Sequence, residues 1–401
     1  MQSSVYVAGV GVISAIGTTT EENFQALKHH RSGIAPMQNI DSIHRGKLPV
    51  GEVPLSNKEL AEHTRVSEAT SRTALLGLHA AGEALQDAQL TSDSRYRVGL
   101  ISANTVGGMD KTESLFPEFL KNAAGINIAD LLQHPCGHST EVIARALRIR
   151  HFITTINTAC SSSVNSIILG TRLIQRGKLD VVIAGGTDAL TRFTLNGFNS
   201  LMILDKNLCR PFDASRAGLN LGEGAGFVVL VSGEVIKEKK LKAYAVVSGY
   251  GNTNDAFHQT ASSPEGRGSA AAMENAMTMA GLSRANIDYI NLHGTGTVNN
   301  DASEGAAIRS VFADRLPSVS STKAYTGHTL GACGGIEAVF SVLALHHQCV
   351  FPNLRFETPV PETGIVPQQQ FEKKTITHVM SNSFGFGGNC SSIILSKPVN
   401  R

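Results

Sequence analysis

Residues 156–177, INTACSSSVNSIILGTRLIQRG, place one cysteine between a β-branched run and an apolar pattern with helical spacing. The pattern predicts a strand that ends just before Cys160 and a helix that begins just after it. A thiol at this position lies beside a helix N-terminus, where the helix dipole and the unpaired amides favour the nucleophilic thiolate. A small buried structural cysteine is the alternative interpretation, and the rest of the chain has to decide between the two.

The same alternation of strand-like and helical segments continues on both sides of this cysteine. Residues 5–13, VYVAGVGVI, and residues 179–186, LDVVIAGG, have the composition of buried strands, and residues 70–90, TSRTALLGLHAAGEALQDAQL, have that of a helix. This rhythm predicts an α/β fold in which parallel strands are covered by helices.

A charged stretch at residues 232–243, SGEVIKEKKLKA, interrupts the apolar pattern and marks the midpoint of the chain. The order then restarts, because residues 243–255, AYAVVSGYGNTND, resemble the opening strand and turn, and residues 327–348, GHTLGACGGIEAVFSVLALHHQ, form a second long apolar helix pattern. The sequence therefore predicts two pseudo-duplicated halves, residues 1–235 and 236–401, whose reactive turns meet at the ends of their strands.

Size and composition exclude several other classes of protein. A chain of 401 residues accommodates two or three domains or one large duplicated domain, and a formal charge of +2 implies neither nucleic acid nor a charged membrane surface as a partner. The six cysteines contain no CxxC pair, which argues against zinc and a disulfide framework and predicts reduced thiols in the cytoplasm. The N-terminal apolar run lacks the cationic start of a signal peptide, and no unbroken apolar run is long enough to span a membrane.

Two histidines occupy turns made of unusually small residues. His293 lies in NLHGTGT and His328 lies in STKAYTGHTLGA, each at a junction between regular elements. Glycines on both sides of the rings let a substrate carbonyl approach the imidazoles closely; they are Gly294, Gly296, Gly327 and Gly331. A capping role is the alternative for one such histidine, but two of them opposite the Cys160 turn in a duplicated fold favour a catalytic set.

Five motifs in order resemble those of the beta-ketoacyl carrier-protein synthases, the elongating condensing enzymes of the thiolase fold. They are TACSSS from Thr158, RPFDASRAGLNLGEGAG from Arg210, HGTGT from His293, STKAYTGHTLGA from Ser321 and SNSFGFGG from Ser381. The resemblance covers nearly the whole chain. It implies a layered α-β-α-β-α thiolase fold and a 3-oxoacyl carrier-protein synthase, which is an acyltransferase.

The resemblance also implies a reaction. Cys160 accepts an acyl chain from a carrier-protein thioester, and His293 and His328 hold the carbonyl of a malonyl thioester while it loses carbon dioxide. The resulting carbanion equivalent attacks the acyl group on Cys160 and extends it by two carbons. The residue types suit this chemistry, because a thiolate is both a nucleophile and a leaving group and imidazole N–H groups stabilise an enolate-like oxygen. The reaction requires no metal or organic cofactor.

Further residues acquire roles only through the resemblance. The backbone amides of Cys160 and Phe386 form an oxyanion hole, and Phe386 also gates the two substrates. Lys323 pairs with Glu304. The remaining implied residues bind the substrate. Thr295 and Thr297 bond the phosphopantetheine arm, and Val106 lies at the position that limits chain length. Phe384 and Asp301 are the other two expected substrate contacts. Some relatives hold a structural Na⁺ or K⁺ at positions that match Asn291, Glu337, Ser381 and Asn382, although ordinary buried hydrogen bonds also explain these four residues.

The chain departs from the family pattern at three places. Val298 stands where the family usually has proline, Asn389-Cys390 replaces Thr-Asn, and residues 201–213 form a shorter segment than in the housekeeping elongation enzymes. No catalytic group is lost, but the acyl preference and the pathway stay open among fatty-acid, polyene and polyketide assembly.

Three other functions fit less well. Degradative thiolases carry a second catalytic cysteine near the C-terminus, yet Cys390 follows the FGFGG gate. Initiating condensing enzymes have asparagine in place of His328. A non-catalytic chain-length partner subunit keeps the fold but loses the nucleophile, and Cys160 is retained.

The resemblance finally implies partners. An acidic acyl carrier protein docks on local basic residues, for which Arg65, Arg72 and Lys206 are the candidates. A homodimer is expected, with a heterodimer containing a chain-length partner as the alternative.

Overall fold

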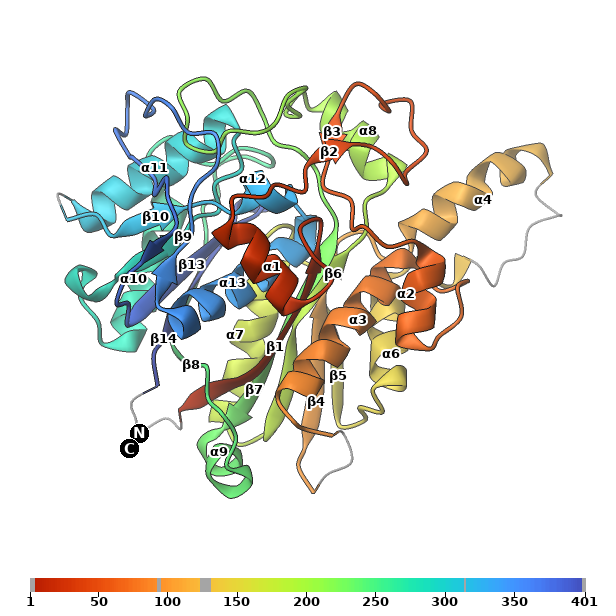
Figure 1. Cartoon of the computed structure of the whole chain (residues 1–401), viewed down its shortest axis with the longest axis horizontal. Helices are drawn as coiled ribbons and strands as arrows, with labels where there is room; N and C mark the ends of the chain where they lie inside the picture. Colours follow the sequence, from red (N-terminus) through yellow and green to blue (C-terminus); the bar gives the residue numbers. More distant parts are fainter. Residues whose placement is uncertain (1–3, 92–94, 123–130, 314, 399–401) are drawn as a thin grey trace.

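The computed structural model describes residues 4–91, 95–122, 131–313 and 315–398. Its centre is a ten-stranded sheet with the strand order β10-β9-β13-β14-β8-β1-β7-β6-β4-β5 (Figure 1). The ten strands are β1 (Val5–Ser14), β4 (Val98–Ala103), β5 (Phe152–Ile156), β6 (Val181–Asp188), β7 (Gly224–Ser232), β8 (Ala245–Asn254), β9 (Tyr289–Asn291), β10 (Ser318–Ser320), β13 (His378–Phe384) and β14 (Asn389–Ser396).

The sheet consists of two halves with the same internal order. From edge to centre the first half runs β5-β4-β6-β7-β1 and the second runs β10-β9-β13-β14-β8. In both halves the three outer strands are parallel and the two inner strands run antiparallel to their neighbours. The halves join where Tyr6 and Val7 of β1 pair with Val246 and Ala245 of β8. The predicted duplicated α/β fold is confirmed.

The prediction of parallel strands is correct for the outer strands and wrong for the inner ones. β13 ends at Phe384 and β14 begins at Asn389, and so short a connection allows only antiparallel pairing. The predicted boundary between residues 235 and 236 falls within α9 (Gly233–Lys239), the helix between β7 and β8.

Helices form three layers around the two halves of the sheet. The middle layer contains α7 (Ser162–Gln175) and α13 (Cys333–His347), which contact each other and strands from both halves. On the outer faces, α3 (Arg72–Asp87) packs on β1, β6 and β7, and α10 (Arg267–Ala280) packs on β8 and β14 (Figure 1). This arrangement is the α-β-α-β-α layering of the thiolase fold.

Paired glycines let each outer helix approach its sheet closely. A Cβ atom at Gly11 of β1 would lie inside contact distance of the Ala80 carbonyl oxygen on α3, and one at Gly251 of β8 would meet the Ala272 carbonyl oxygen on α10. Glycine faces alanine at both places, so the same close contact between strand and helix occurs in both halves. The high glycine content of 39 residues therefore reflects close packing of backbones.

The segment Leu330–His347 has the length and apolar composition of a membrane span, but 89% of it is buried inside the protein. Every residue of α13 from Cys333 to Leu345 is buried. We therefore assign it as the central core helix.

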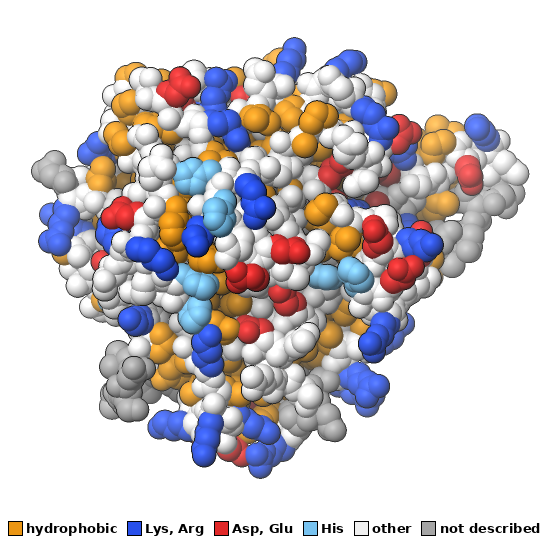
Figure 2. All heavy atoms as spheres, viewed as in Figure 1, with side chains coloured by type: hydrophobic (Ala, Val, Ile, Leu, Met, Phe, Trp, Pro, Cys, Tyr) orange, Lys and Arg blue, Asp and Glu red, His pale blue; other side chains and the backbone are white. Residues whose placement is uncertain are grey.

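The remaining elements lie around this core, and on the face shown in Figure 2 acidic and basic side chains are interspersed. α4 projects from the body at the right of Figure 1. These elements are α1 (Thr20–Lys28), β2 (Ala35–Pro36), β3 (Pro49–Val50), α2 (Asn57–Thr64), α4 (Met109–Lys121), α6 (Cys136–Ala146), α8 (Arg192–Ser200), α11 (Val298–Phe312), α12 (Lys323–Thr326), β11 (Cys349–Val350), β12 (Glu372–Lys373) and short 3₁₀ turns at Arg284–Asn286, Leu330–Ala332 and Phe386–Gly388.

Candidate active site

Cys160 lies in the sharp turn between β5 and α7, as the sequence predicts. Ala159 adopts a left-handed conformation with φ of 54°, which is unusual for a residue with a side chain. The turn is held by hydroxyl groups, because Ser161 Oγ donates to the Thr158 carbonyl at 2.7 Å and the Thr158 N–H donates to Ser162 Oγ at 2.8 Å. The serines after the cysteine therefore stabilise a strained connection that presents the thiol.

His293 follows β9, and its backbone is fixed by a buried carboxylate. The N–H groups of His293 and Gly294 donate to Glu304 of α11 at 2.9 and 2.8 Å. Burial raises the pKa of Glu304 to about 7, while these two N–H groups act in the opposite direction. Glu304 thus anchors the HGTGT turn.

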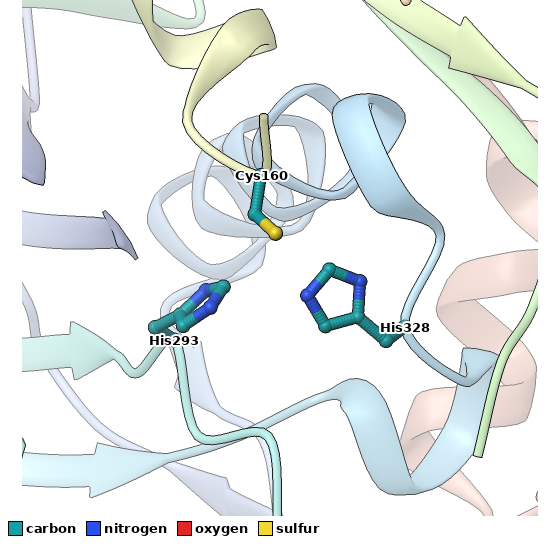
Figure 3. A group of neighbouring side chains, drawn as sticks. All are labelled: Cys160, His293 and His328. Atoms are coloured by element: carbon teal, nitrogen blue, oxygen red, sulfur yellow. The ribbon is translucent and has the colours of Figure 1, made fainter. Parts of the chain in front are cut away.

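His328 lies between α12 and α13 and is fixed through its own backbone. Its N–H donates to the Asn220 carbonyl at 2.7 Å, and its carbonyl accepts the Gly222 N–H at 3.0 Å. The two histidine rings lie 5.5 Å apart between centroids, and the sulfur of Cys160 faces the gap between them (Figure 3). The Cys160 sulfur and one nitrogen of each ring all lie within 4.8 Å of one another. The structure therefore brings together the three side chains that the sequence selected.

Hydrogen bonds fix the tautomers of both rings. Lys323 Nζ lies 3.3 Å from His293 Nδ1, and the Leu330 N–H donates to His328 Nδ1 at 3.0 Å. Since both Nδ1 atoms accept a hydrogen bond, the proton of each neutral ring resides on Nε2.

Both rings are kept neutral by their surroundings. Burial, and after it the positive charge of Lys323, lower the pKa of His328 to about 3. Burial, then Lys323 and then His328 hold the pKa of His293 well below its usual value. The pair therefore presents two N–H donors, which suits a negatively charged oxygen. A metal ion would need the Nε2 lone pairs instead, so this trio is poorly prepared to hold one.

Lys323 forms a buried ion pair with Glu337 of α13, not with Glu304 as expected from the resemblance. Lys323 Nζ also donates to the His293 carbonyl at 2.6 Å. Burial acts against the ammonium, but the Glu337 carboxylate together with Cys333 and Glu304 outweighs it, and the pKa of Lys323 is raised. The resemblance implied Glu304 as the partner and Glu337 only as a possible cation ligand, and the packing of α13 against the histidine turn makes Glu337 the partner instead.

Burial raises the pKa of the Cys160 thiol to about 11, although the charge of Lys323 and the Phe386 N–H lower it. The expected preference for the thiolate beside a helix N-terminus is therefore outweighed by desolvation. At neutral pH the sulfur carries its proton, so the thiolate has to form during the reaction.

A cavity of about 260 Å³ opens onto the three side chains. Thr295 and Thr297 line it, and their hydroxyl oxygens lie 2.9 Å apart. Phe384 also lines it, with its ring centroid 5.9 Å from that of His293. Phe386 lines the outer part and stacks on Phe198 of α8 at 5.8 Å between centroids.

Asp301 and Val106 are not among the described residues that line this cavity. The Asp301 carboxylate is fully buried and accepts N–H groups from Phe212 at 2.7 Å and Gly296 at 3.2 Å. Its placement contradicts the expected contact with substrate and makes it a support for the HGTGT turn. Val106 is buried in an apolar cluster with Leu330 and with Leu219, which does line the cavity, so its expected role at the chain-length gate stays a prediction.

Three of the four expected cation ligands have unsatisfied polar atoms. Within the described chain, no hydrogen-bond partner is present for either polar atom of the Asn291 side chain, for Ser381 Oγ or for Glu337 Oε2, and all are buried. Asn291 and Ser381 are register partners on β9 and β13. Buried polar atoms without partners are rare, and oxygen donors of this kind fit a hard cation. Asn382 differs, because its side chain already bonds Glu304 and Ser392.

The candidate docking residues separate into two groups. Arg72 is wrong as a docking residue, because only 11% of its side chain is exposed and its guanidinium forms an ion pair with Glu223 at 2.6 Å. Arg65 is exposed at the end of α2, and Lys206 is exposed beside a pocket of about 510 Å³ that also contains Lys47, Arg210 and Arg355.

Sequence reasoning missed other residues around the site. His258 lines the cavity from the loop after β8, and the Cys333 thiol donates to the Cys160 carbonyl at 3.2 Å. Asp188 ends β6 and is fully buried. Its place at the carboxyl end of a parallel strand was the one available signal, because ligands bind at such ends.

Comparisons with known proteins agree with this geometry. The model of the beta-ketoacyl synthase N-terminal domain matches residues 2–235, and that of the C-terminal domain matches residues 244–357. A 3-oxoacyl-[acyl-carrier-protein] synthase 2 from Staphylococcus aureus is 34% identical over 98% of each chain.

Solved structures give the same result. The ishigamide ketosynthase/chain length factor matches with a TM-score of 0.94 and 31% identity over 100% of both chains. AntDE:AntF, a type II PKS acyl-carrier protein in complex with its ketosynthase, matches with a TM-score of 0.91 and 25% identity over 99% of this chain and 100% of that one. The chain therefore belongs to the beta-ketoacyl synthase family and is a condensing acyltransferase.

Proposed function

We propose that Cys160 carries the growing acyl chain and that His293 and His328 bind the malonyl thioester during decarboxylative condensation. The observation that carries this assignment is the pair of fixed, neutral Nε2–H donors beside the Cys160 sulfur. The product is a 3-oxoacyl chain two carbons longer on the carrier protein.

Acyl transfer comes first. The Cys160 sulfur attacks the carbonyl of the acyl thioester, and the negative charge on that oxygen is taken up by the backbone N–H groups of Cys160 and Phe386. The carbon–sulfur bond to the phosphopantetheine arm then breaks, and the thiol proton moves to the departing sulfur. The direction of the Phe386 N–H toward the Cys160 thiol supports this oxyanion hole.

Condensation follows when a malonyl thioester enters the same cavity. Its carbonyl oxygen accepts the Nε2–H groups of His293 and His328, the bond to the carboxylate breaks, and carbon dioxide leaves. The electron pair forms an enolate, whose carbon attacks the acyl carbonyl on Cys160. The Cys160 thiolate is expelled and takes up a proton. Fixed donors of this kind contribute about 3–4 kcal/mol each to stabilising the developing oxyanion.

Other residues have positioning roles in this proposal. Glu304 holds the backbone of His293, and Lys323 with Glu337 holds its ring. Thr295 and Thr297 bind the phosphopantetheine arm from the cavity wall. Phe386, with its partner Phe198, separates the acyl and malonyl subsites, and Val106 limits the acyl chain.

A monovalent cation fits the three unsatisfied groups of Asn291, Ser381 and Glu337. When bound, the ion supplies positive charge to the second oxygen of Glu337, whose first oxygen pairs with Lys323. Replacing Na⁺ and K⁺ by a bulky organic cation should then lower the thermal stability of the protein, and Glu337→Gln should abolish that dependence.

The partners are an acyl carrier protein in the cytoplasm and a second copy of this chain. Relatives named as carrier-protein synthases support the first. The second is supported by the edge strand β5, where Ile153 is exposed, and by the exposed Phe116, Phe119 and Leu120 on the projecting α4. Sedimentation of the purified chain should show a dimer. A monomer that pairs only with a chain-length partner would replace the homodimer by a heterodimer, the kind of partner named for the ishigamide ketosynthase.

Intact-mass spectrometry tests the assignment directly. The native protein incubated with an acyl carrier-protein thioester should gain one acyl group on Cys160 and lose it to product when malonyl carrier protein is added. Cys160→Ala should gain none and make no product. A native protein that takes up no acyl group on Cys160, or an alanine variant that still condenses, would favour the non-catalytic partner role.

A further inference from the structure

Two segments of the active site converge on the carboxylate of Asp188. This residue ends β6 and is fully buried. Its oxygens accept the Thr105 N–H at 2.9 Å, the Thr105 hydroxyl at 2.8 Å and the Val106 N–H at 3.1 Å. The same carboxylate accepts the Gly331 N–H at 2.7 Å. One charged group therefore binds both the segment that contains Val106 and the loop that follows His328.

Gly331 brings these segments into direct contact. A Cβ atom at this position would lie 2.8 Å from Asp188 Oδ2 and 2.9 Å from Thr105 Cγ2, so any other residue would push one of these two side chains away. The Gly331 carbonyl accepts the hydroxyl of Ser163, which lies on α7 three residues after the nucleophile. Gly331 is thus held at its N–H by Asp188 and at its carbonyl by the nucleophile helix.

The neighbouring residue extends this connection to the catalytic ring. Leu330, immediately before Gly331, donates the N–H that fixes the tautomer of His328. Leu330 adopts a left-handed conformation with φ of 53°, which needs support from its surroundings. Leu330 also packs in the apolar cluster that contains Val106. A movement of Val106 therefore reaches the His328 loop by two routes, through Asp188 and through Leu330.

We propose that Asp188 is a positioning residue that couples the acyl-chain gate at Val106 to the donor geometry of His328. The inference rests on the proposed roles of Val106 and His328 in chain limitation and decarboxylation. An acyl chain that presses on Val106 shifts the Thr105–Val106 amides against the carboxylate, and the carboxylate transmits this shift to Gly331 and Leu330. Decarboxylation at His328 thereby responds to the chain held on Cys160.

A carboxylate is required for this role because four donors converge on it. An asparagine of the same shape offers one acceptor oxygen and turns an NH₂ group toward N–H donors, so at least one of the two segments is released. Asp188→Asn should therefore have two separate effects. It should change the ratio of kcat/KM between long and short acyl donors about fivefold or more, and it should lower malonyl decarboxylation about tenfold.

Two variants that each remove one hydrogen bond test the Val106 segment and the His328 loop separately. Thr105→Val removes only the hydroxyl bond to Asp188 and should shift the chain-length ratio while leaving decarboxylation of malonyl thioester on the unacylated enzyme unchanged. Ser163→Ala removes only the bond to the Gly331 carbonyl and should lower decarboxylation while leaving the chain-length ratio of acyl transfer unchanged. A purely structural role for these contacts predicts equal losses in both assays.

The experiment measures acylation of Cys160 by intact mass, with saturated acyl carrier-protein thioesters of increasing length, and release of carbon dioxide from malonyl carrier protein. It uses the full-length protein as purified, either as the homodimer or as the complex with a chain-length partner. If Asp188→Asn lowers both activities by one common factor at every chain length, the coupling is wrong. It is also wrong if Thr105→Val leaves the chain-length ratio, and Ser163→Ala leaves decarboxylation, at the wild-type value.

Thr105→Val and Ser163→Ala still test the coupling if Asp188→Asn does not fold. Failure of the proposed function is distinguishable, because the wild-type protein would then neither acylate Cys160 nor release carbon dioxide. Failure of the coupling alone leaves both wild-type activities intact.

Discussion

The N–H of Leu330 donates a hydrogen bond to Nδ1 of His328 at 3.0 Å, so the main chain itself decides which nitrogen of this ring carries the proton. A backbone amide cannot reverse its role, and the neutral ring is left with a donor at Nε2. His293 reaches the same state through Lys323, a side chain whose own charge depends on Glu337. The two proposed donors therefore have different supports, and they should respond differently to mutation.

Replacing His328 should separate the two half-reactions. His328→Ala removes one donor to the enolate oxygen and should lower malonyl decarboxylation about 100- to 1,000-fold, while acylation of Cys160 changes little. His328→Asn keeps an N–H donor and should fall between alanine and wild type. Carbon dioxide release and intact-mass acylation report the two steps separately. An alanine variant that decarboxylates at the wild-type rate would remove His328 from the mechanism.

The buried pair of Lys323 and Glu337 should show strong coupling. Lys323→Met leaves the carboxylate of Glu337 buried without its partner and should lower the free energy of unfolding by about 3–5 kcal/mol. The double variant Lys323→Met/Glu337→Gln should lose less than the sum of the single variants. Because the chain has no tryptophan, circular dichroism in denaturant is the suitable measurement. Additive losses would mean that the two residues stabilise the protein independently.

The Cys160 thiol should react slowly at neutral pH. Because burial raises its pKa to about 11, the thiolate fraction and the rate of alkylation by iodoacetamide should rise about tenfold per pH unit from pH 7 to 10 without a plateau. Lys323→Met removes a positive charge that lowers this pKa, so the variant should react more slowly at each pH. Intact mass of the native protein, with Cys160→Ala as the control, gives the rate. A plateau near pH 7 would show that the thiolate forms in the resting enzyme.

Two glycine-to-alanine variants should change stability in opposite directions. Gly11 of β1 lies against the backbone of α3, so Gly11→Ala forces the helix away and should destabilise the protein by about 1–3 kcal/mol or more. Gly82 lies within α3 and has no atom within 4 Å of an added Cβ, so Gly82→Ala should stabilise the helix by about 0.5–1 kcal/mol. Thermal unfolding of the two variants provides the comparison, and equal shifts would contradict the close-packing argument.

Arg65 and Arg72 should behave differently although both are arginines near α2. Arg65→Glu and Lys206→Glu should raise KM for carrier-protein substrates with little change in kcat, because both side chains are exposed. Arg72→Glu should instead lower stability, because it leaves Glu223 buried beside a second carboxylate. A free pantetheine thioester serves as the control substrate, and its KM should not change. Equal loss of kcat and affinity in the Arg65 and Lys206 variants would exclude docking as their role.

Much of the fold follows from the sequence because its signals are local. The β-branched run before Cys160, the helical spacing after it and the repeat of Gly-x-Gly in the strands of both halves each depend on residues close together in the chain. The same is true of the glycine-rich turns around His293 and His328. Periodicity and turn chemistry therefore predict where the side chains of Cys160, His293 and His328 emerge, and the order of the five motifs identifies the family.

The sequence by itself determined the alternation of strands and helices and the duplicated α/β fold, and it selected Cys160, His293 and His328 as the candidate reactive side chains. Only the tertiary structure decided that Lys323 pairs with Glu337, that Arg72 is mostly buried, that Asp301 supports a turn and that burial keeps the Cys160 thiol protonated. These properties depend on which distant side chain reaches a given charge and on how much water is excluded around it. Electrostatic and desolvation energies are set by positions in space, and neither periodicity nor motif spacing encodes them.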